Sequence, residues 1–181
     1  MKPTGIVRRL DELGRIVIPK EIRRTFRIKE SDPMEIFTGK DGEIILKKYS
    51  PIGEMGLFAK QYAESLSQVS AHTALIADRD VYIAVTGSIK GAIGKSIGKE
   101  LEDHMNKREV VLAHKGERSF IPMWEDMPEE VQGIVAAPII AAGDVVGVVC
   151  LISNNPKERM GDVEKKLIQA GAGFLGKQLE Q

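Results

Sequence analysis

The sequence predicts an α+β protein with a small, mainly β domain at residues 1–50 and a larger α+β domain at residues 55–181, joined by a linker at 51–54. Three observations support this. Short alternating apolar runs, bounded by proline and glycine, dominate the first part and are typical of strands. Apolar residues recurring every three or four positions indicate helices at both ends of the second part. The net charge also changes sign between the two parts.

The two parts differ in charge although the whole chain is neutral. Residues 1–50 carry 12 Lys and Arg against 8 Asp and Glu, a net charge of +4, and residues 51–181 carry 14 against 18, a net charge of −4. A basic end on a mildly acidic body is typical of a protein that binds a polyanion, although a solvated basic face would have the same composition.

The N-terminal domain is expected to contain four short strands and one helix. Their order is strand 4–11, strand 15–19, helix 20–28, strand 34–38 and strand 43–48. Pro19 ends the second strand because it has no amide hydrogen for a ladder, and Asp41-Gly42 is a strong hairpin signal. A domain this small, without disulfides or metal, buries too little apolar surface to be stable alone, so we expect it to form a dimer.

The larger domain alternates between helix and strand patterns. After a first helix come strands at 72–78 and 81–87, a helix at 94–109, strands at 109–113, 118–122, 133–141 and 145–153, and a last helix that starts at Asp162. This order predicts an antiparallel sheet packed with helices, an α+β sandwich.

The first and last helices of this domain each carry an apolar seam. The seams consist of Met55, Ala59, Tyr62, Leu66 and Val69 in the first helix, and of Val163, Leu167, Ala170 and Phe174 in the last. Each seam either packs on the protein's own sheet or pairs with helices of other subunits, and the spacing fits both. Gly171, Gly173 and Gly176 each weaken a lone helix by roughly 1 kcal/mol relative to Ala. They also allow another backbone to approach closely.

A set of cations lies around the predicted helix at 20–28. Lys20, Arg23, Arg24 and Arg27 recur at spacings of three and four, which places them on one helix face. The large apolar residues Ile22 and Phe26 take the other face. A cationic stripe without a matching acidic stripe is suited to phosphate, so we expect this face to bind nucleic acid.

The first 50 residues resemble the AbrB-type DNA-binding domain of bacterial transition-state regulators. The resemblance rests on the segments GIVR, DELGR, IVIPKEIRR and the EIF…EIILKKY hairpin. It implies a dimeric barrel of swapped hairpins that presents a basic hinge helix to double-stranded DNA. It places the DNA-contacting side chains at Arg8, Arg15, Arg23 and Arg24, with supporting contacts from Lys2, Arg9 and Lys20.

The combination of both parts resembles the stage V sporulation protein T family. The segments LKKYSPI, DRDVYIAVTG and AGFLGKQLEQ carry this resemblance. It implies a C-terminal GAF-type domain whose helices join two dimers into a tetramer, and a homo-oligomeric regulator that activates or represses sporulation genes. We expect A·T-rich DNA as the partner, and the GAF-type domain is a candidate site for an unidentified small molecule.

No residue pattern indicates catalysis, a metal site or a cofactor, so we do not expect an enzyme. GAIGKSIG lacks the glycine that a nucleotide-binding loop requires, because Ile89 occupies that position. His72, His104 and His114 have no paired-ligand spacing, and Cys150 lies within an apolar strand pattern. Two alternatives remain open: a small-molecule receptor, or an antitoxin-like protein whose basic end binds a protein.

The chain is expected to be cytoplasmic and to have no membrane partner. Its longest apolar runs, IVAAPIIAA and VVGVVCLI, are too short to span a bilayer and are interrupted by proline or glycine. A single cysteine cannot form a disulfide framework, which fits a reducing compartment.

Overall fold

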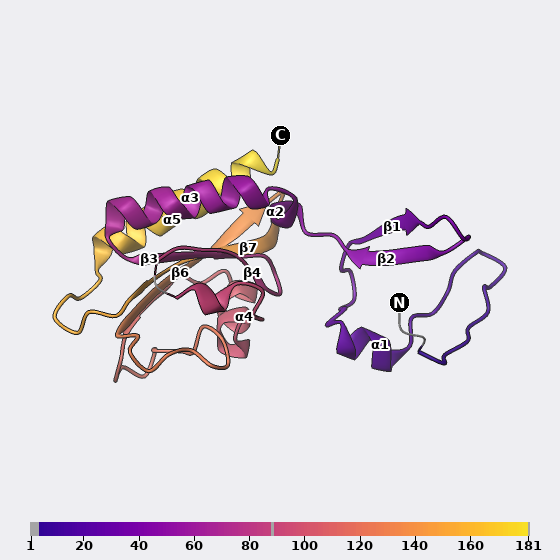
Figure 1. The fold of residues 1–181 in the computed structure, drawn as a ribbon, viewed down its shortest axis with the longest axis horizontal. Helices are drawn as coiled ribbons and strands as arrows, with labels where there is room; N and C mark the ends of the chain where they lie inside the picture. Colours follow the sequence, from indigo (N-terminus) through magenta and orange to yellow (C-terminus); the bar gives the residue numbers. More distant parts are fainter. Residues whose placement is uncertain (1–3, 88, 181) are drawn as a thin grey trace. The chain divides into compact units, whose positions relative to one another are not determined.

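A computed structural model describes residues 4–87 and 89–180 of the chain. The chain divides into two compact units, Met1–Tyr49 and Ser50–Gln181, and each combines helices with antiparallel strands (Figure 1). The predicted α+β fold class is confirmed.

The N-terminal unit contains one short helix and one hairpin. Its elements are α1 (Lys20–Thr25), β1 (Met34–Thr38) and β2 (Ile44–Lys48). The two strands pair antiparallel, from Met34 opposite Lys48 to Thr38 opposite Ile44. Helix α1 stops earlier than the predicted 20–28, because Arg27 adopts a left-handed conformation with a φ of 49°.

The strands expected at 4–11 and 15–19 are not formed, and the N-terminal sheet is not closed into a barrel within one chain. A strand requires a neighbour that bonds its N–H and C=O groups. In the described part of the chain, no segment pairs with these residues as a ladder. Among residues 4–49, Pro19 alone is buried, so this unit has no hydrophobic core of its own.

The C-terminal unit is built on one antiparallel sheet of five strands in the order β4-β3-β7-β6-β5. Its helices are α2 (Pro51–Glu54), α3 (Gly56–Ser70), η1 (Lys90–Ala92), α4 (Lys99–Asn106) and α5 (Asp162–Gln178). Its strands are β3 (Thr73–Ala77), β4 (Tyr82–Val85), β5 (Val111–His114), β6 (Gly133–Ala141) and β7 (Asp144–Ser153). Helices α3 and α5 lie side by side on one face of the sheet, and α4 covers the other (Figure 1).

Both faces of the sheet are covered, which explains why the central strands read as continuous apolar runs. In β7, Val149 and Leu151 face the layer of α3 and α5, whereas Val148, Cys150 and Ile152 face α4. Because successive side chains of a strand point to opposite faces of the sheet, β7 contributes to two separate cores.

Two predicted elements of this unit differ from the structure. Residues 118–122 do not form a strand, because the turn after β5 carries them off the sheet edge and across its face. There Ile121 packs into the core beneath α4, so its apolar character comes from packing and not from a ladder. The helix expected at 94–109 begins only at Lys99, since Gly94 has a φ of 74° and Ser96 forms an antiparallel bridge with Val81, the residue before β4.

The segment at 51–54 was expected to be a linker but forms helix α2. Ser50 caps this helix by accepting a hydrogen bond from the amide of Gly53, and its hydroxyl donates to the Asp78 carboxylate at 3.0 Å. Ile52 is fully buried in the core formed with α3 and α5. Burial of this one large side chain attaches the segment to the C-terminal unit.

Candidate nucleic-acid interface

The described cations predicted to contact DNA all lie on the surface of the N-terminal unit. Arg8, Arg9, Arg15, Lys20, Arg23 and Arg24 are exposed, and Lys2 lies outside the described residues. They come from three segments: the extended stretch before the first turn, the turn itself, and helix α1. Each is free to meet a phosphate from solvent without first losing a core contact.

Helix α1 presents three of these cations. Lys20 opens the helix, and Arg23 and Arg24 lie in its last turn, where positive charge also complements the negative end of the helix dipole. Arg27, which the spacing placed on the same face, lies beyond the end of the helix.

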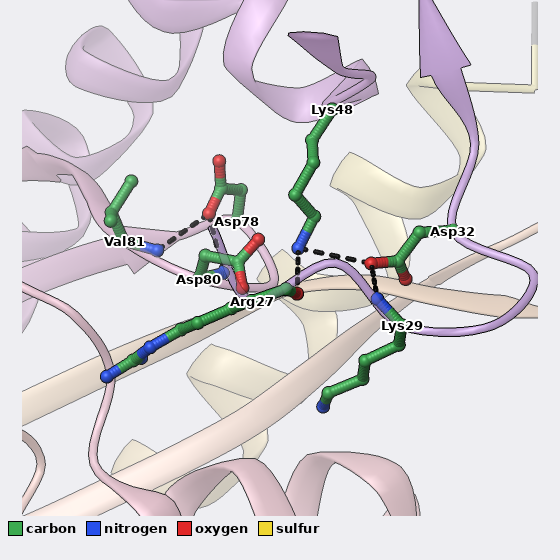
Figure 2. Close-up of polar contacts among 7 residues, drawn as sticks. All are labelled: Arg27, Lys29, Asp32, Lys48, Asp78, Asp80 and Val81. Carbon is green, nitrogen blue, oxygen red and sulfur yellow. Dashed lines mark hydrogen bonds and ion pairs between the residues drawn. The ribbon is translucent and has the colours of Figure 1, made fainter. Parts of the chain in front are cut away.

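The chain after α1 is fixed by a small polar network (Figure 2). The Lys48 ammonium group at the end of β2 donates to the Arg27 carbonyl at 3.1 Å and lies 3.3 Å from the Asp32 carboxylate. The same carboxylate oxygen accepts from the Lys29 amide at 2.8 Å. Asp32 and Lys48 thereby join the carboxyl end of the basic helix to the hairpin. The residue types gave no signal for this network, which sequence reasoning missed.

The turn that carries Arg15 is closed by Asp11. One carboxylate oxygen of Asp11 accepts from the amides of Leu13 at 3.0 Å and Arg15 at 2.8 Å, and the other accepts from the Arg15 Nε–H at 2.7 Å. The Asp11 amide also donates to the Arg15 carbonyl. The hydrogen bond from the Arg15 amide, followed by that from the guanidinium, lowers the pKa of Asp11.

An apolar groove with a volume of about 550 Å³ runs through the N-terminal unit. Its lining includes Ile6, Arg8, Ile16, Val17, Ile18, Pro19, Ile22, Phe26, Ile28, Met34 and Leu46. Val17 is 72% exposed and Phe26 61% exposed. The N-terminal unit has no buried core of its own, so the groove exposes apolar side chains that a complete hydrophobic core would bury.

The predicted helix seams of the C-terminal unit behave differently from each other. On α3, Ala59 and Leu66 are buried against the unit's own sheet, while Val69 is exposed. On α5, the core contacts come from Ile168, Ala172 and Leu175, which sequence reasoning missed.

The α5 seam lies beside the line of core contacts. Val163 is 68% exposed and Phe174 43% exposed, Ala170 is exposed and Leu167 is half-buried. Phe174 also stacks on Tyr62 of α3, with ring centroids 5.6 Å apart. The α5 seam therefore remains largely on the surface, whereas much of the α3 seam belongs to the core.

Cys150 lies in the same buried core of the C-terminal unit as Trp124 and Tyr82. Burial raises the pKa of the Cys150 thiol far above its usual range, which leaves it protonated and a poor nucleophile. Trp124 packs edge-on against Tyr82 in the same core, and the Tyr82 hydroxyl donates to the Met123 carbonyl at 2.9 Å. In the described part of the chain, no helix has both the length and the apolar character needed to cross a membrane.

Two family models match the chain, one for each unit. The model of the C-terminal domain of stage V sporulation protein T, a transcription factor, matches residues 54–180. The model of the antidote-toxin recognition family MazE, a bacterial antitoxin, matches residues 7–54.

Two curated relatives agree with these matches. The stage V sporulation protein T of Bacillus subtilis (strain 168) is 50% identical over 182 residues, which is 100% of both chains. The transition state regulatory protein AbrB of the same strain is 63% identical over 51 residues, 28% of this chain and 52% of its own.

Solved structures resemble the C-terminal unit in fold. The free methionine-R-sulfoxide reductase of Thermoplasma acidophilum superposes with a TM-score of 0.55 at 12% identity, over 71% of this chain and 94% of its own. The GAF domain of a Coxiella burnetii phosphoenolpyruvate-protein phosphotransferase gives a TM-score of 0.55 at 15% identity, over 69% and 82%. At such low identity the likeness shows the fold alone, which is the predicted GAF-type sheet.

A basic AbrB-type domain followed by a GAF-type sheet defines a class of two-domain transcription factors. The full-length identity and the family model that covers residues 54–180 identify the member of that class. The chain belongs to the stage V sporulation protein T family, as the sequence resemblance predicted.

Proposed function

We propose that the chain regulates sporulation genes by binding A·T-rich, double-stranded DNA through its N-terminal unit. Direct contacts come from Arg8, Arg15, Arg23 and Arg24, with support from Lys2, Arg9 and Lys20. The observation that carries this proposal is the exposure of the described members of this set on a unit related to AbrB. On a purely structural basic face, most cations would be paired with acidic side chains. Few of the described cations of this set have such a partner, and the clearest pair is Arg15 with Asp11.

The N-terminal unit acts as a homodimer in which a second copy fills the apolar groove. Support comes from the absence of a core among residues 4–49 and from the exposure of large apolar residues such as Val7 and Val17. The edges of 4–11 and 15–19 have unpaired backbone groups that strands of a second copy can bond. Dimerisation thus supplies both the missing core and the missing ladder, and it doubles the number of cations that face the DNA.

Phosphate contacts dominate the affinity, because arginines outnumber groups that are suited to reading bases. If the two protomers together engage about eight phosphates, the slope of log K against log salt is roughly −7. Sequence preference then arises from the shape and deformability of A·T-rich DNA, together with a few guanine contacts from arginine.

The exposed α5 seam joins two such dimers into a tetramer. Val163 and Phe174 place apolar area on the surface of α5 that a helix of a second dimer can cover. The assembled protein then carries two DNA-binding dimers, which raises the affinity for paired sites by multivalency. The GAF-type unit acts in this assembly and as a candidate ligand sensor, and not as an enzyme.

Fluorescence anisotropy on an A·T-rich duplex tests the proposal. Full-length protein is titrated at several salt concentrations beside the Arg23→Ala and Arg24→Ala variants, with Lys107→Ala in the C-terminal unit as a matched loss of one exposed cation. We expect tight, steeply salt-dependent binding that each arginine variant weakens several-fold and the lysine variant leaves unchanged. Absence of binding at low salt would overturn the DNA assignment and favour a protein partner for the basic end.

A further inference from the structure

We propose that Asp11 is a positioning residue for DNA binding, which clamps the guanidinium of Arg15 in the orientation that receives a phosphate. The inference rests on the proposed DNA-binding function. It assigns a part in that function to Asp11, which is negatively charged like the DNA. A carboxylate on a DNA-binding face repels phosphate, so its presence there needs a compensating role.

The two oxygens of the Asp11 carboxylate have separate partners. Oδ1 accepts from the amides of Leu13 and Arg15, which closes the turn around Gly14, and Oδ2 accepts from the Arg15 Nε–H at 2.7 Å. Gly14 adopts a φ of 72°, a conformation that glycine takes without strain. One side chain therefore shapes the turn and holds the guanidinium at the same time.

The clamp uses the Nε–H of Arg15 and leaves its outer edge for a ligand. A guanidinium has five N–H donors, and each terminal nitrogen directs one N–H along the outer edge, away from the Nε–H. The Arg15 side chain is 70% exposed, so these donors reach solvent. A phosphate can bind the two terminal nitrogens as a fork while Asp11 holds the third.

Fixing this side chain lowers the entropic cost of binding. A free arginine side chain has about 2 kcal/mol of rotamer entropy to lose when it is immobilised on a ligand, which corresponds to a factor of about 30 in affinity. Part of that loss has already occurred in the free protein when Asp11 holds Arg15. Pre-organisation of this kind raises affinity without adding a contact to the DNA.

The clamp and simple electrostatics predict opposite results for one substitution. Asp11→Asn removes a negative charge from the face, so electrostatics alone predicts tighter DNA binding. Asparagine keeps an oxygen for the two turn amides, but its other atom is a donor that cannot accept from the Arg15 Nε–H. The substitution therefore removes the clamp and retains the turn, and the clamp predicts weaker binding.

The matched control is Glu12→Gln, which removes the neighbouring carboxylate. In the described part of the chain, Glu12 has no hydrogen-bonded or ion-pair partner, and its side chain is exposed. Affinity for the A·T-rich duplex is measured by anisotropy for wild type, Asp11→Asn, Glu12→Gln, Arg15→Ala and the Asp11→Asn/Arg15→Ala double variant. The NMR signal of the Arg15 Nε–H is recorded for the first three without DNA, as a readout that does not depend on binding.

We expect Asp11→Asn to bind about fivefold more weakly, because both protomers of a dimer lose the clamp on Arg15. Glu12→Gln should bind equally or slightly more tightly. In the Arg15→Ala background, Asp11→Asn should cost nothing further, because the clamp acts only through Arg15. The chemical shift of the Arg15 Nε–H should be the same in Glu12→Gln as in wild type. It should move in Asp11→Asn, because the hydrogen bond to Oδ2 is lost.

Equal or tighter binding by Asp11→Asn would overturn the clamp while leaving the DNA-binding function intact. An undiminished loss in the Arg15→Ala background would also overturn it, since Asp11 would then act through the turn alone. Failure of wild type and Glu12→Gln to bind the duplex would instead overturn the proposed function, and this inference with it.

Discussion

The Lys48 ammonium group at the end of β2 lies 3.3 Å from the carboxylate of Asp32, two residues before the start of β1. The Asp32 side chain is only 4% exposed, so its charge is separated from most of the solvent. Because Lys48 also binds the Arg27 carbonyl, this ion pair holds the end of the basic helix against the hairpin.

Asp32→Asn should loosen the attachment of helix α1. Neutralising a hydrogen-bonded, poorly exposed carboxylate costs roughly 1–2 kcal/mol and removes the ion pair between Asp32 and Lys48. Hydrogen–deuterium exchange of the full-length protein, followed in peptides that cover residues 20–29, should be faster in the variant. DNA affinity should fall with it, because Arg23 and Arg24 are carried on the same helix.

The control for this change is Asp41→Asn in the hairpin turn. Its carboxylate is exposed, so exchange around α1 should stay at the wild-type rate, and stability should change by no more than about 0.5 kcal/mol. Equal protection of residues 20–29 in Asp32→Asn and wild type would show that the hairpin does not fix the helix.

Two glycines of α5 should respond in opposite directions to alanine. A Cβ at Gly176 would overlap the carbonyl oxygen of Ile140 in β6, whereas one at Gly173 would meet nothing within 4 Å. Gly176→Ala should therefore destabilise the unit by about 1–3 kcal/mol, because backbone cannot move aside as easily as a side chain. Gly173→Ala should stabilise it by up to about 1 kcal/mol through helix propensity.

Urea unfolding followed by the fluorescence of Trp124 measures both effects. Trp124 is the chain's one tryptophan and lies buried in the C-terminal unit, so its signal reports on that unit. A Gly176→Ala midpoint at or above that of wild type would contradict the close approach of α5 to β6.

The Cys150 thiol should be unreactive in the folded protein. Burial raises its pKa and removes it from solvent, so a thiol reagent such as dithionitrobenzoate at pH 8 should label it only when the unit opens. Labelling should rise with urea in parallel with the Trp124 signal. Rapid labelling without denaturant would mean that the core around Cys150 opens locally.

Glu117 should contribute stability that depends on pH. The hydrogen bond from the His114 amide, and then the charges of His114 and Arg159, lower its pKa from the usual 4.5. A carboxylate whose folded pKa is lowered stabilises fully above the unfolded value, and this contribution is lost as pH falls through the folded pKa. The stability difference between wild type and Glu117→Gln should be constant above about pH 5.5 and shrink below pH 4.5.

The control is Glu129→Gln, whose carboxylate has no ion pair in the described part of the chain. Its stability difference from wild type should stay flat across the same range. Thermal unfolding between pH 3.5 and 7 compares the variants, and a gap for Glu117→Gln that grows at low pH would reverse the assignment.

The hairpin and the two long helices could be predicted because their signals are local. Asp41-Gly42 between two apolar runs specifies β1 and β2, and the periodicity of 56–70 and 162–178 specifies α3 and α5. The side of α5 that faces the core was harder. The predicted seam of Val163 and Phe174 is largely exposed, and Ile168 and Leu175 next to it are buried. Helix α5 has two neighbouring rows of apolar residues, and either could face the core by its spacing. Packing against the sheet decides which row is buried.

The basic residues of the candidate site could be predicted from the sequence, but the acidic residues that hold them in place could not. Arg15, Arg23 and Arg24 stand out by charge and by resemblance, whereas Asp11 and Asp32 are ordinary acids until their partners are known. Asp11 gave one usable signal, an acid four residues before an arginine across a glycine turn. Asp32 gave none, because Lys48 lies 16 residues away and meets it only when the hairpin closes.

The sequence by itself determined the family, the α+β class, the basic N-terminal unit, the hairpin of β1 and β2, and the two long helices α3 and α5. Tertiary structure decided which apolar line of α5 enters the core, why residues 118–122 leave the sheet, and which acids hold the basic residues in place. It also left residues 4–11 and 15–19 without ladder partners in one chain. Propensity and charge act over a turn or a strand, but burial, pairing and ion pairs depend on residues that only the folded chain brings together.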